Sequence, residues 1–578
     1  MNKRFNIEKV LPLDQVNSII PSGEIEIGHP EPDFNIIDKI TKKWIPEIQK
    51  SIVKAYQMNN RWAFNDLFHK RGLLFSEFMQ LYNAEIKEED YTRKTAFLYL
   101  NIHTKAELYT KFIFKYEKQS KEEAYTDCMR NSGFSEILGF FLPKLPGRIS
   151  YKDLLPHAYV SGSSGSGKSG FLRLLIYQLH KNYPNNSLLI IDPHSDLAKQ
   201  AYYSDASLDK ERVVYISPDL RENYTAIFNP FDVGIKSEQE ADLLAQEMDG
   251  IIQSMLDEES SNVLKSILHP ILCILLLKKG STFADIVRFL DPDNNSDLIK
   301  AGLESPFLHH RPLFERIIKE KGYYSRTRES LTAKLQSIIN YDSFYKMCMG
   351  DSTVNLKYCL NNKKVVIFSL PFGQTGGQAR ELLGKLILNQ VMHIGFERAK
   401  IPEEFRPQTF IIVDEAQNFI TSTLAKGYDE LRKYGMHFIT ASQYVNQLES
   451  IQESILANSN VKIIGWNNTK DTYNKLMNTS GIMENVLHTL EPLTFYIKAG
   501  AKHGFKYKLS KKLFGDKHMM TPDEMRAMDE FQLKNYYTPF DRTKLHKRKH
   551  EHKHDDIKDN HDDKPLDLFL PDDLPTKP

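Results

Sequence analysis

The chain has 578 residues, of which 41% are hydrophobic and 26% charged, and its formal net charge at pH 7 is +1. These values are ordinary for a globular protein and exclude a chain that is basic overall, so any nucleic-acid binding must come from local patches. The cysteines are scattered, without a CxxC pair or metal-ligand spacing, and they predict reduced thiols in an intracellular protein. They are Cys128, Cys273, Cys348 and Cys359.

The sequence predicts no integral membrane segment. Its best candidate, ILHPILCILLL at 267–277, is shorter than the ~18 apolar residues that a bilayer span needs, and it is interrupted by Pro270. We expect a buried helix or strand there. The first residues, MNKRFNIEKVLPLDQ, have no apolar core of signal-peptide length. A cytoplasmic protein is therefore expected, peripheral to the inner membrane only through partners.

Helical patterns fill the first part of the chain. In KWIPEIQKSIVKAYQM, at 43–58, apolar residues recur three and four positions apart, and we expect residues 1–135 to be mainly helical. A stretch rich in glycine and proline, from 133 to 147, reads as a linker or a small irregular region.

From about residue 150 the pattern changes to short apolar runs alternating with helical stretches. Such runs predict strands of a parallel sheet covered by helices on both faces, which is an α/β fold. The runs are HAYV, SLLIID, RVVYIS, KKVVIFSLP, TFIIVDE, MHFITAS and VKIIGW.

The strand signal fades between residues 235 and 360. SEQEADLLAQEMDGIIQSML, at 237–256, carries apolar residues at helical spacing, and RESLTAKLQSIINYDSF behaves similarly. We expect an all-helical domain inserted into the sheet domain. The sheet domain would then comprise residues 136–234 and 361–515, followed by a C-terminal extension at 516–578.

The end of that extension is highly charged and predicts disorder from about residue 541. It finishes in PLDLFLPDDLP, an apolar island that is either a docking segment or a plain solvated terminus. Its histidines suit metal binding, but a soluble spacer is the simpler interpretation. They include His546, His550, His552 and His554.

A phosphate-binding motif stands in HAYVSGSSGSGKSGFLRLL, at 157–175, between a predicted strand and a predicted helix. Glycines let successive backbone N–H groups surround phosphate oxygens, and the helix N-terminus adds its dipole. Lys168 would reach the β- and γ-phosphates, and Ser169 would ligate Mg²⁺. The alternative, a flexible linker with a chance lysine, does not explain the strand and helix on either side. The expected cofactor-binding residues are Gly162, Ser163, Ser164, Gly165, Ser166, Gly167, Lys168, Ser169 and Gly170.

TFIIVDEAQNF, at 409–419, ends a predicted strand in two acidic residues. In a P-loop fold the strand beside the P-loop strand is expected to end this way. Asp414 would face the Mg²⁺ ion, and Glu415 would orient or deprotonate the attacking water, which favours hydrolysis over mere binding. Without the P-loop, a turn or a helix cap would explain the pair equally well.

Two further strand ends carry candidate residues. In SLLIIDPHSDLAKQ, Asp192 and His194 end a strand at the edge where ligands gather, although a structural role for His194 is as plausible. In ELRKYGMHFITASQYVNQLE, Gln443 follows a strand and would sense the γ-phosphate. Arg432 would reach the nucleotide of a neighbouring subunit, or merely complement a helix dipole.

These four motifs, in this order, resemble those of the VirD4/TraG coupling proteins, the VirB4 ATPases and the HerA/FtsK translocases. The resemblance covers residues 155–510. Ser169 and Asp414 are 245 positions apart (414 − 169), and members of this clade fill that interval with an all-helical domain. NVKIIGWNNTKDTYNKL, at 460–476, also resembles the coupling-protein pattern.

The resemblance implies a RecA-like motor that depends on ATP and Mg²⁺, works as a homo-oligomer, namely a hexamer, and moves DNA or a protein–DNA complex through a central channel. Secretion proteins or a relaxase would be its partners. Two departures are visible. Ser195 stands where these families usually have glycine, which predicts a less tight loop. The transmembrane pair of membrane-anchored coupling proteins is missing, which keeps two alternatives open. They are a HerA-like DNA translocase in repair or defence, and a VirB4-like ATPase that energises a secretion channel without DNA.

The sequence itself points to DNA only in part. KGYYSRTRESLTAKLQ, at 321–336, mixes tyrosines with basic residues that suit phosphates and bases, but an ordinary solvated helix face has the same composition. A scaffold that binds nucleotide without turnover is a further alternative, and the intact Lys168, Ser169, Asp414 and Glu415 argue against it.

Overall fold

The computed structural model describes most of the chain from residue 147 to residue 540. The described residues are 24–30, 147–235, 237–254, 262–319, 325–371, 376–467, 470–480, 487, 490–501, 504–510 and 515–540. The predicted N-terminal helices and the charged tail beyond residue 540 lie outside these ranges, as does Cys128.

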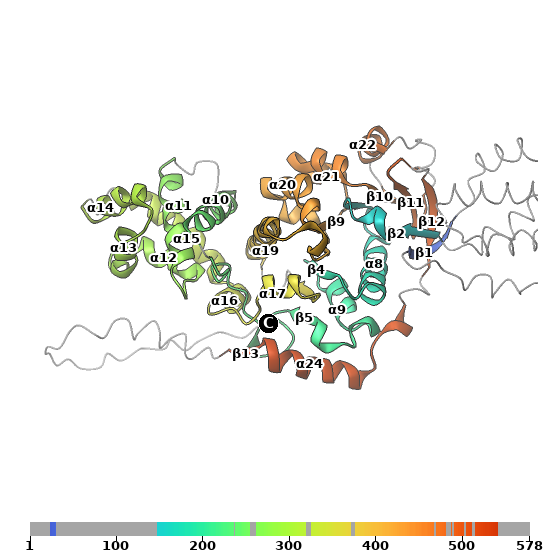
Figure 1. Cartoon of the computed structure of the whole chain (residues 1–578), viewed down its shortest axis with the longest axis horizontal. Helices are drawn as coiled ribbons and strands as arrows, with labels where there is room; N and C mark the ends of the chain where they lie inside the picture. Colours follow the sequence, from blue (N-terminus) through green and yellow to red (C-terminus); the bar gives the residue numbers. More distant parts are fainter. Residues whose placement is uncertain are drawn as a thin grey trace, which may run out of the picture.

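A single large sheet forms the centre of the molecule, with strand order β2-β1-β12-β11-β10-β3-β9-β8-β4-β7-β5 (Figure 1). Seven of these strands, from β10 to β5 in that order, run parallel to one another. They are β3 (Ala158–Ser161), β4 (Ser187–Asp192), β5 (Val213–Ile216), β7 (Val365–Ser369), β8 (Thr409–Val413), β9 (Met436–Ser442) and β10 (Val461–Gly465). All seven coincide with the apolar runs in the sequence, so the prediction of a mainly parallel α/β sheet is confirmed.

The other end of the sheet is antiparallel and was not predicted. It consists of β11 (Thr494–Ala499), β12 (Phe505–Leu509), β1 (Glu24–Pro30) and β2 (Gly147–Ser150). Thus β1 is a strand within the region expected to be mainly helical, and β2 lies at the end of the expected linker. The segments EIEIGHP and FKYKL alternate polar with apolar residues, as strands with only one covered face do, whereas the prediction relied on continuous apolar runs.

Helices cover both faces of the parallel part, which explains its continuous apolar strands. In β4, Leu188 and Ile190 pack in the core beneath α8 (Lys168–Asn182) and α9 (Asp196–Tyr202). The alternate residues of β4 belong to the core on the opposite face. That core includes α19 (Gly377–Glu397), α20 (Ser422–Glu430) and α21 (Gln452–Asn458). This is the architecture of a RecA-like α/β fold.

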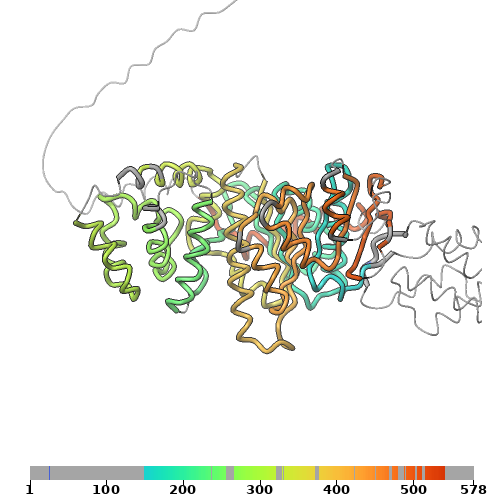
Figure 2. Tube along the Cα trace, turned by 90° about the horizontal axis from the view of Figure 1, so that it is seen from above, coloured from blue at the N-terminus to red at the C-terminus, as the bar shows by residue number. Residues whose placement is uncertain are grey.

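Between β6 (Tyr224–Thr225) and β7 the described chain is helical. This insert lies at one end of the molecule and the antiparallel strands at the other, in both views (Figure 1, Figure 2). Its α-helices are α10 (Glu238–Ser254), α11 (Asn262–Leu277), α12 (Phe283–Leu290), α13 (Ser296–Leu303), α14 (Arg311–Lys319), α15 (Ser325–Ile339), α16 (Asp342–Cys348) and α17 (Leu356–Asn361). The run ILHPILCILLL is part of α11, so of the two expected structures it is the helix. No helix in the described ranges is both long and apolar enough to cross a bilayer.

The first part of the C-terminal extension closes the open edge of the sheet. There α24 (Pro522–Tyr536) runs along β5, and β13 (Thr538–Pro539) pairs with β6. The Gln532 side chain accepts a hydrogen bond from Tyr215 N at 3.0 Å and donates one to Val213 O at 2.8 Å. It thereby satisfies the edge strand as a neighbouring strand would, which protects that edge from pairing with another chain.

Candidate functional site

The predicted site residues gather at the carboxyl edge of the parallel strands, where ligands bind in open α/β sheets. The expectation that the acidic strand lies beside the P-loop strand is wrong, because β9 pairs with both β3 and β8 and separates them. Strands are roughly 4.8 Å apart, so two side chains must span roughly 10 Å across the end of β9. Lysine and glutamate are long enough to do so. Gln443, which follows β9, consequently lies between the two motifs.

The P-loop backbone is held open by contacts to its neighbours. Gly165 and Gly167 have φ angles of 82° and 97°, in the left-handed region that favours glycine. Ser163 N donates to Trp466 O at 3.0 Å, and Leu493 N donates to Ser166 O at 2.8 Å. A Cβ atom on Gly167 would lie 2.7 Å from the Leu493 side chain. The loop therefore needs glycine at position 167 for both its conformation and its packing.

Lys168 is the first residue of α8 and joins the two distant motifs. Its side chain is buried, and its Nζ donates to Asp414 Oδ1 and, at 2.7 Å, to Glu415 Oε1. Both carboxylates are buried as well. A lysine and two carboxylates in so little solvent interact far more strongly than a surface ion pair does.

The protonation states follow from this pairing. Burial alone lowers the pKa of Lys168, but Asp414 and Glu415 outweigh it, so the pKa is raised and the ammonium is retained. Burial likewise works to raise the pKa of Glu415, but Lys168 and the hydrogen bonds from two glutamines hold it below its usual value. Glu415 is consequently ionised at neutral pH.

Glu415 is fixed in an uncommon backbone conformation. Its φ of 46° and ψ of 52° are left-handed, which costs a non-glycine residue about 1–2 kcal/mol. Its carboxylate accepts hydrogen bonds from Gln417 Nε2 at 2.6 Å and from Gln443 Nε2 at 3.4 Å. The side-chain contacts thus hold a strained residue that aims its carboxylate at the P-loop lysine.

Asp192 is the last residue of β4 and is buried near Asp414. Its Oδ1 accepts from His194 N and its Oδ2 from Ala198 N, both at 2.8 Å, so the carboxylate caps the start of α9. Burial raises the pKa of Asp192, and these two hydrogen bonds oppose the rise. The side chain of His194 is exposed, and the printed contact of this residue with the site is made by its backbone.

Ser195 has a left-handed backbone conformation, which favours glycine. Its φ is 71°, and its Oγ accepts a hydrogen bond from Ser369 Oγ of β7 at 2.8 Å. The backbone is therefore left-handed at Ser195, and the Ser195 side chain is hydrogen-bonded to the neighbouring strand β7.

Arg432 is not brought to the P-loop of its own chain. It is exposed in η10 (Leu431–Tyr434), before the start of β9, whereas Gln443 follows the end of that strand. The seven residues of β9 span roughly 20 Å, so Arg432 lies at the opposite edge of the sheet. Within one chain it cannot contact the Lys168 cluster.

Three contributors to the site were not among the predicted residues: Gln417, Trp466 and Leu493. Gln417 had a usable signal, since it is polar and follows the acidic pair within the same turn. Trp466 and Leu493 act through their backbones and their shape, and nothing in residue type or spacing marks such a contact. The antiparallel strand that begins beside Leu493 was itself unpredicted.

The sheet, the P-loop between β3 and α8, and the carboxylates after β8 define this chain as a P-loop NTPase of the RecA-like class. Residues 143–391 match the family described as helicase HerA, central domain. Residues 408–530 match the family described as the TraM recognition site of TraD and TraG. The resemblance to HerA and to VirD4/TraG-type coupling proteins is thereby confirmed, each from a different half of the ATPase-like domain.

Solved structures with a similar chain path include the plasmid coupling protein TrwB in complex with a non-hydrolysable GTP analogue. It is 16% identical over 63% of this chain and 88% of that chain, with a TM-score of 0.48. VirB4 of Thermoanaerobacter pseudethanolicus is 15% identical over 64% of this chain and 91% of that chain, with a TM-score of 0.42. No curated protein matches the sequence. At these identities and scores the likeness extends to the chain path and to nothing more specific.

Proposed function

We propose that this chain is an ATP-hydrolysing motor that translocates DNA or a protein–DNA complex, in the manner of conjugative coupling proteins. The contact of Lys168 with both Asp414 and Glu415 is the observation that carries the proposal. It brings the phosphate-binding loop together with an acidic pair that begins 246 positions further along the chain, and P-loop hydrolysis uses both elements at one site.

The residues present fit ATP and Mg²⁺. The glycines of the loop supply close backbone approach, and Ser164 and Gly165 are exposed at its tip. Ser169 is exposed at the second position of α8, and Asp414 is buried beside Lys168. A hydroxyl and a carboxylate are the oxygen donors that Mg²⁺ prefers, so Ser169 and Asp414 would hold the ion, directly or through water. The ion would supply charge neutralisation of the β- and γ-phosphate oxygens.

Lys168 would change partners when nucleotide binds. Its ammonium, now shared by two carboxylates, would turn to the β- and γ-phosphates and release Glu415. The freed carboxylate, still hydrogen-bonded by Gln417 and Gln443, would accept the proton of the attacking water. The Gln443 side chain donates to Glu415, and the Gln443 backbone O accepts a hydrogen bond at 2.8 Å from Nδ2 of Asn467, which follows β10. It would report the state of that carboxylate to β10.

Assembly into a ring, a hexamer by resemblance, would bring Arg432 to the nucleotide of a neighbouring subunit. Its exposure at the sheet edge opposite the P-loop favours a role in trans over one in cis. DNA as the cargo rests on the two family matches, to a helicase domain and to a segment of TraD and TraG. Recognition of a relaxase or of a secretion protein by residues 408–530 would follow from the second match.

Glu415→Gln tests hydrolysis. The amide keeps the shape and the contacts of the carboxylate but cannot accept a proton, so turnover should fall by roughly 100- to 10,000-fold while ATP stays bound. Glu430→Gln is the matched control, since Glu430 is exposed at the end of α20, and its turnover should equal that of the wild type. Normal turnover by Glu415→Gln would refute the assignment of the base.

The cargo is tested separately with the wild-type chain. We expect its ATPase rate to rise severalfold with single- or double-stranded DNA and the rise to fade with added salt, as phosphate contacts are screened. The particle mass with ATP bound should be that of a closed ring. A rate that ignores DNA would instead favour the VirB4-like role, and nucleotide binding without any turnover would favour the scaffold.

A further inference from the structure

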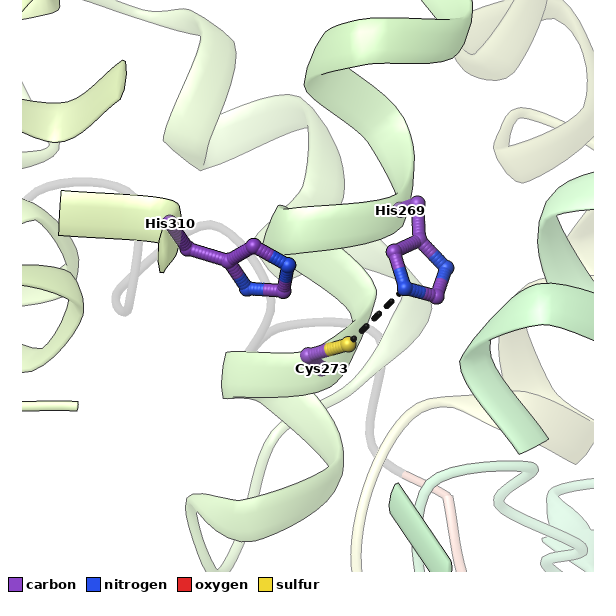
Figure 3. Close-up of side chains that lie close together, drawn as sticks. All are labelled: His269, Cys273 and His310. Carbon is purple, nitrogen blue, oxygen red and sulfur yellow. Dashed lines mark hydrogen bonds between the residues drawn. The ribbon is translucent and has the colours of Figure 1, made fainter. Parts of the chain in front are cut away.

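Two histidines and a cysteine meet inside the helical insert, far from the nucleotide site in the fold. His269 and Cys273 stand four positions apart on α11 and therefore share a face of that helix. His310 comes from η6 (Leu308–His310), the short turn that leads into α14. Figure 3 shows the three side chains converging on one point. One ligand atom of each lies within 4.8 Å of the other two.

The distances suit a small cation. Zinc binds thiolate sulfur at roughly 2.3 Å and imidazole nitrogen at roughly 2.0–2.1 Å, which spaces tetrahedral donors roughly 3.3–3.8 Å apart. Cys273 Sγ lies 3.5 Å from His269 Nε2, within that range. An approach of about 1 Å by His310 would complete three positions, a shift that a side-chain rotation can supply.

A fourth donor comes from α10. Asp242 Oδ1 lies 3.0 Å from His269 Nε2 and 4.0 Å from Cys273 Sγ, so three different donor types face the same small volume. Asp242 and His269 keep part of their surface in solvent, which leaves a path for an ion to enter. Two imidazoles, one thiolate and one carboxylate form a donor set that zinc accepts and magnesium does not favour.

The groups do not fully satisfy one another as they stand. His310 is only 7% exposed, and its Nδ1 has no hydrogen-bond partner among the described residues. Buried polar atoms normally have a hydrogen-bond partner. In a metal-ligating histidine, one ring nitrogen binds the ion and the other commonly makes a hydrogen bond.

We infer that His269, Cys273 and His310, with Asp242 as the fourth ligand, form a structural zinc site. The site would fasten η6 and α14 to α10 and α11, which pack against each other and are already joined by the contact of Asp242 with His269. Binding would displace the thiol proton of Cys273 to solvent and replace it with the metal–sulfur bond, with no change in oxidation state.

The test uses the full chain, because no part of it is known to fold alone. Histidines of the charged tail would bind metal adventitiously, so every variant carries glutamine in their place. They are His546, His550, His552, His554 and His561. After removal of metal with a chelator, Co²⁺ is added as a spectroscopic probe in the presence of excess Mg²⁺. We expect one ion per chain and a sulfur-to-cobalt charge-transfer band, which only a thiolate ligand produces.

Cys273→Ser should abolish that band and lower zinc affinity by roughly 100-fold or more. Cys359→Ser is the matched control, because it also replaces a buried thiol and lies outside the cluster, and it should retain the band. Should Cys273→Ser fail to fold, His269→Gln removes a ligand from a partly exposed position and should weaken Co²⁺ binding at least tenfold. Absence of the band in the parent chain, or its persistence in Cys273→Ser, would overturn the inference.

Discussion

Two buried polar clusters in this molecule solve the same electrostatic problem in opposite ways. At the sheet edge, two carboxylates are buried against an ammonium that the chain itself supplies, Lys168. In the helical insert, the buried members of the cluster are kept neutral instead, since burial lowers the pKa of His310 to about 4 and raises the pKa of Cys273 to about 12. In the first cluster the ammonium can turn from the carboxylates to a bound phosphate, whereas the second cluster has no cation of its own and can take up a metal ion. The buried charges at the sheet edge thus suit a site that binds and releases nucleotide in each turnover. The buried neutral donors of the insert suit a site that keeps its metal ion.

The strongest way to break this comparison is to remove the internal cation. Lys168→Ala leaves Asp414 and Glu415 buried without compensation and deprives the P-loop of its phosphate contact. We expect turnover to fall at least ~1,000-fold and the free energy of unfolding to drop by roughly 3–5 kcal/mol. A steady-state ATPase assay and chemical denaturation would measure the two effects.

Lys199→Ala is the control for that experiment. Lys199 pairs with Asp219 at 3.0 Å, but its side chain is 48% exposed, so the pair should contribute less than about 1 kcal/mol and no activity. Equal destabilisation by the two substitutions would mean that burial does not distinguish the Lys168 cluster from a surface ion pair.

Substitution of Arg432 tests whether the nucleotide site needs a residue from a second chain. Arg432→Ala should lower turnover by on the order of 100- to 1,000-fold while leaving nucleotide affinity nearly unchanged, because the arginine acts across a subunit boundary. Mixing Arg432→Ala chains with Lys168→Ala chains should restore activity, since roughly a quarter of the interfaces in a random ring then pair an intact lysine with an intact arginine. Inactive mixtures that still assemble would contradict the role in trans.

Much of the nucleotide edge could be predicted because chemistry and topology coincide there. Parallel strands end at one edge, so residues that follow apolar runs, such as Asp414 and Gln443, meet however far apart they are in sequence. The order of the strands could not be predicted, because β8 and β9 have the same apolar pattern and their residues do not identify the strands with which they pair. The insertion of β9 between the two motifs therefore appeared only in the fold.

The cluster in the insert escaped prediction for a different reason. Cys273 was judged by its spacing from other cysteines, whereas its nearest partner is a histidine one helical turn away, within a run recognised only for its hydrophobicity. His310 joins them from 37 positions beyond Cys273 (310 − 273), through helix packing that no periodicity encodes. In the helical insert, side chains meet through the packing of helices against one another. At the sheet edge, they meet because parallel strands all end on the same side.

A smaller effect is expected from the two glutamines that hold Glu415. Gln443→Ala should lower DNA-stimulated turnover by roughly 10- to 100-fold, because it removes the side chain that connects Glu415 to the Gln443 backbone, which accepts from Asn467 after β10. Gln417→Ala removes a shorter hydrogen bond, at 2.6 Å, but no link to another strand, so basal and stimulated rates should fall together. A steady-state assay with and without DNA separates these outcomes, and equal effects of the two substitutions on stimulation would deny Gln443 its relay role.

The smallest effect separates the two clusters by pH. His310 has a pKa of about 4 when folded against 6.5 when unfolded, so protons favour the unfolded insert and stability is lost as pH falls from 6.5 towards 4. Glu415 has a lowered pKa, so its contribution is complete above 4.5 and is lost only below that value. Burial also lowers the pKa of His157 and His180 to about 3 and that of His437 to about 4, so the sheet loses stability over the same pH range. Between pH 7 and pH 5.5, His310 should add about a tenfold loss of hydrogen-exchange protection in α11 of the metal-free protein. His310→Gln should remove this pH dependence, while His309→Gln, a change at an exposed neighbour, should preserve it. A loss of protection in α11 that is as large in His310→Gln as in the parent chain would mean that His310 does not set the pH response of the insert.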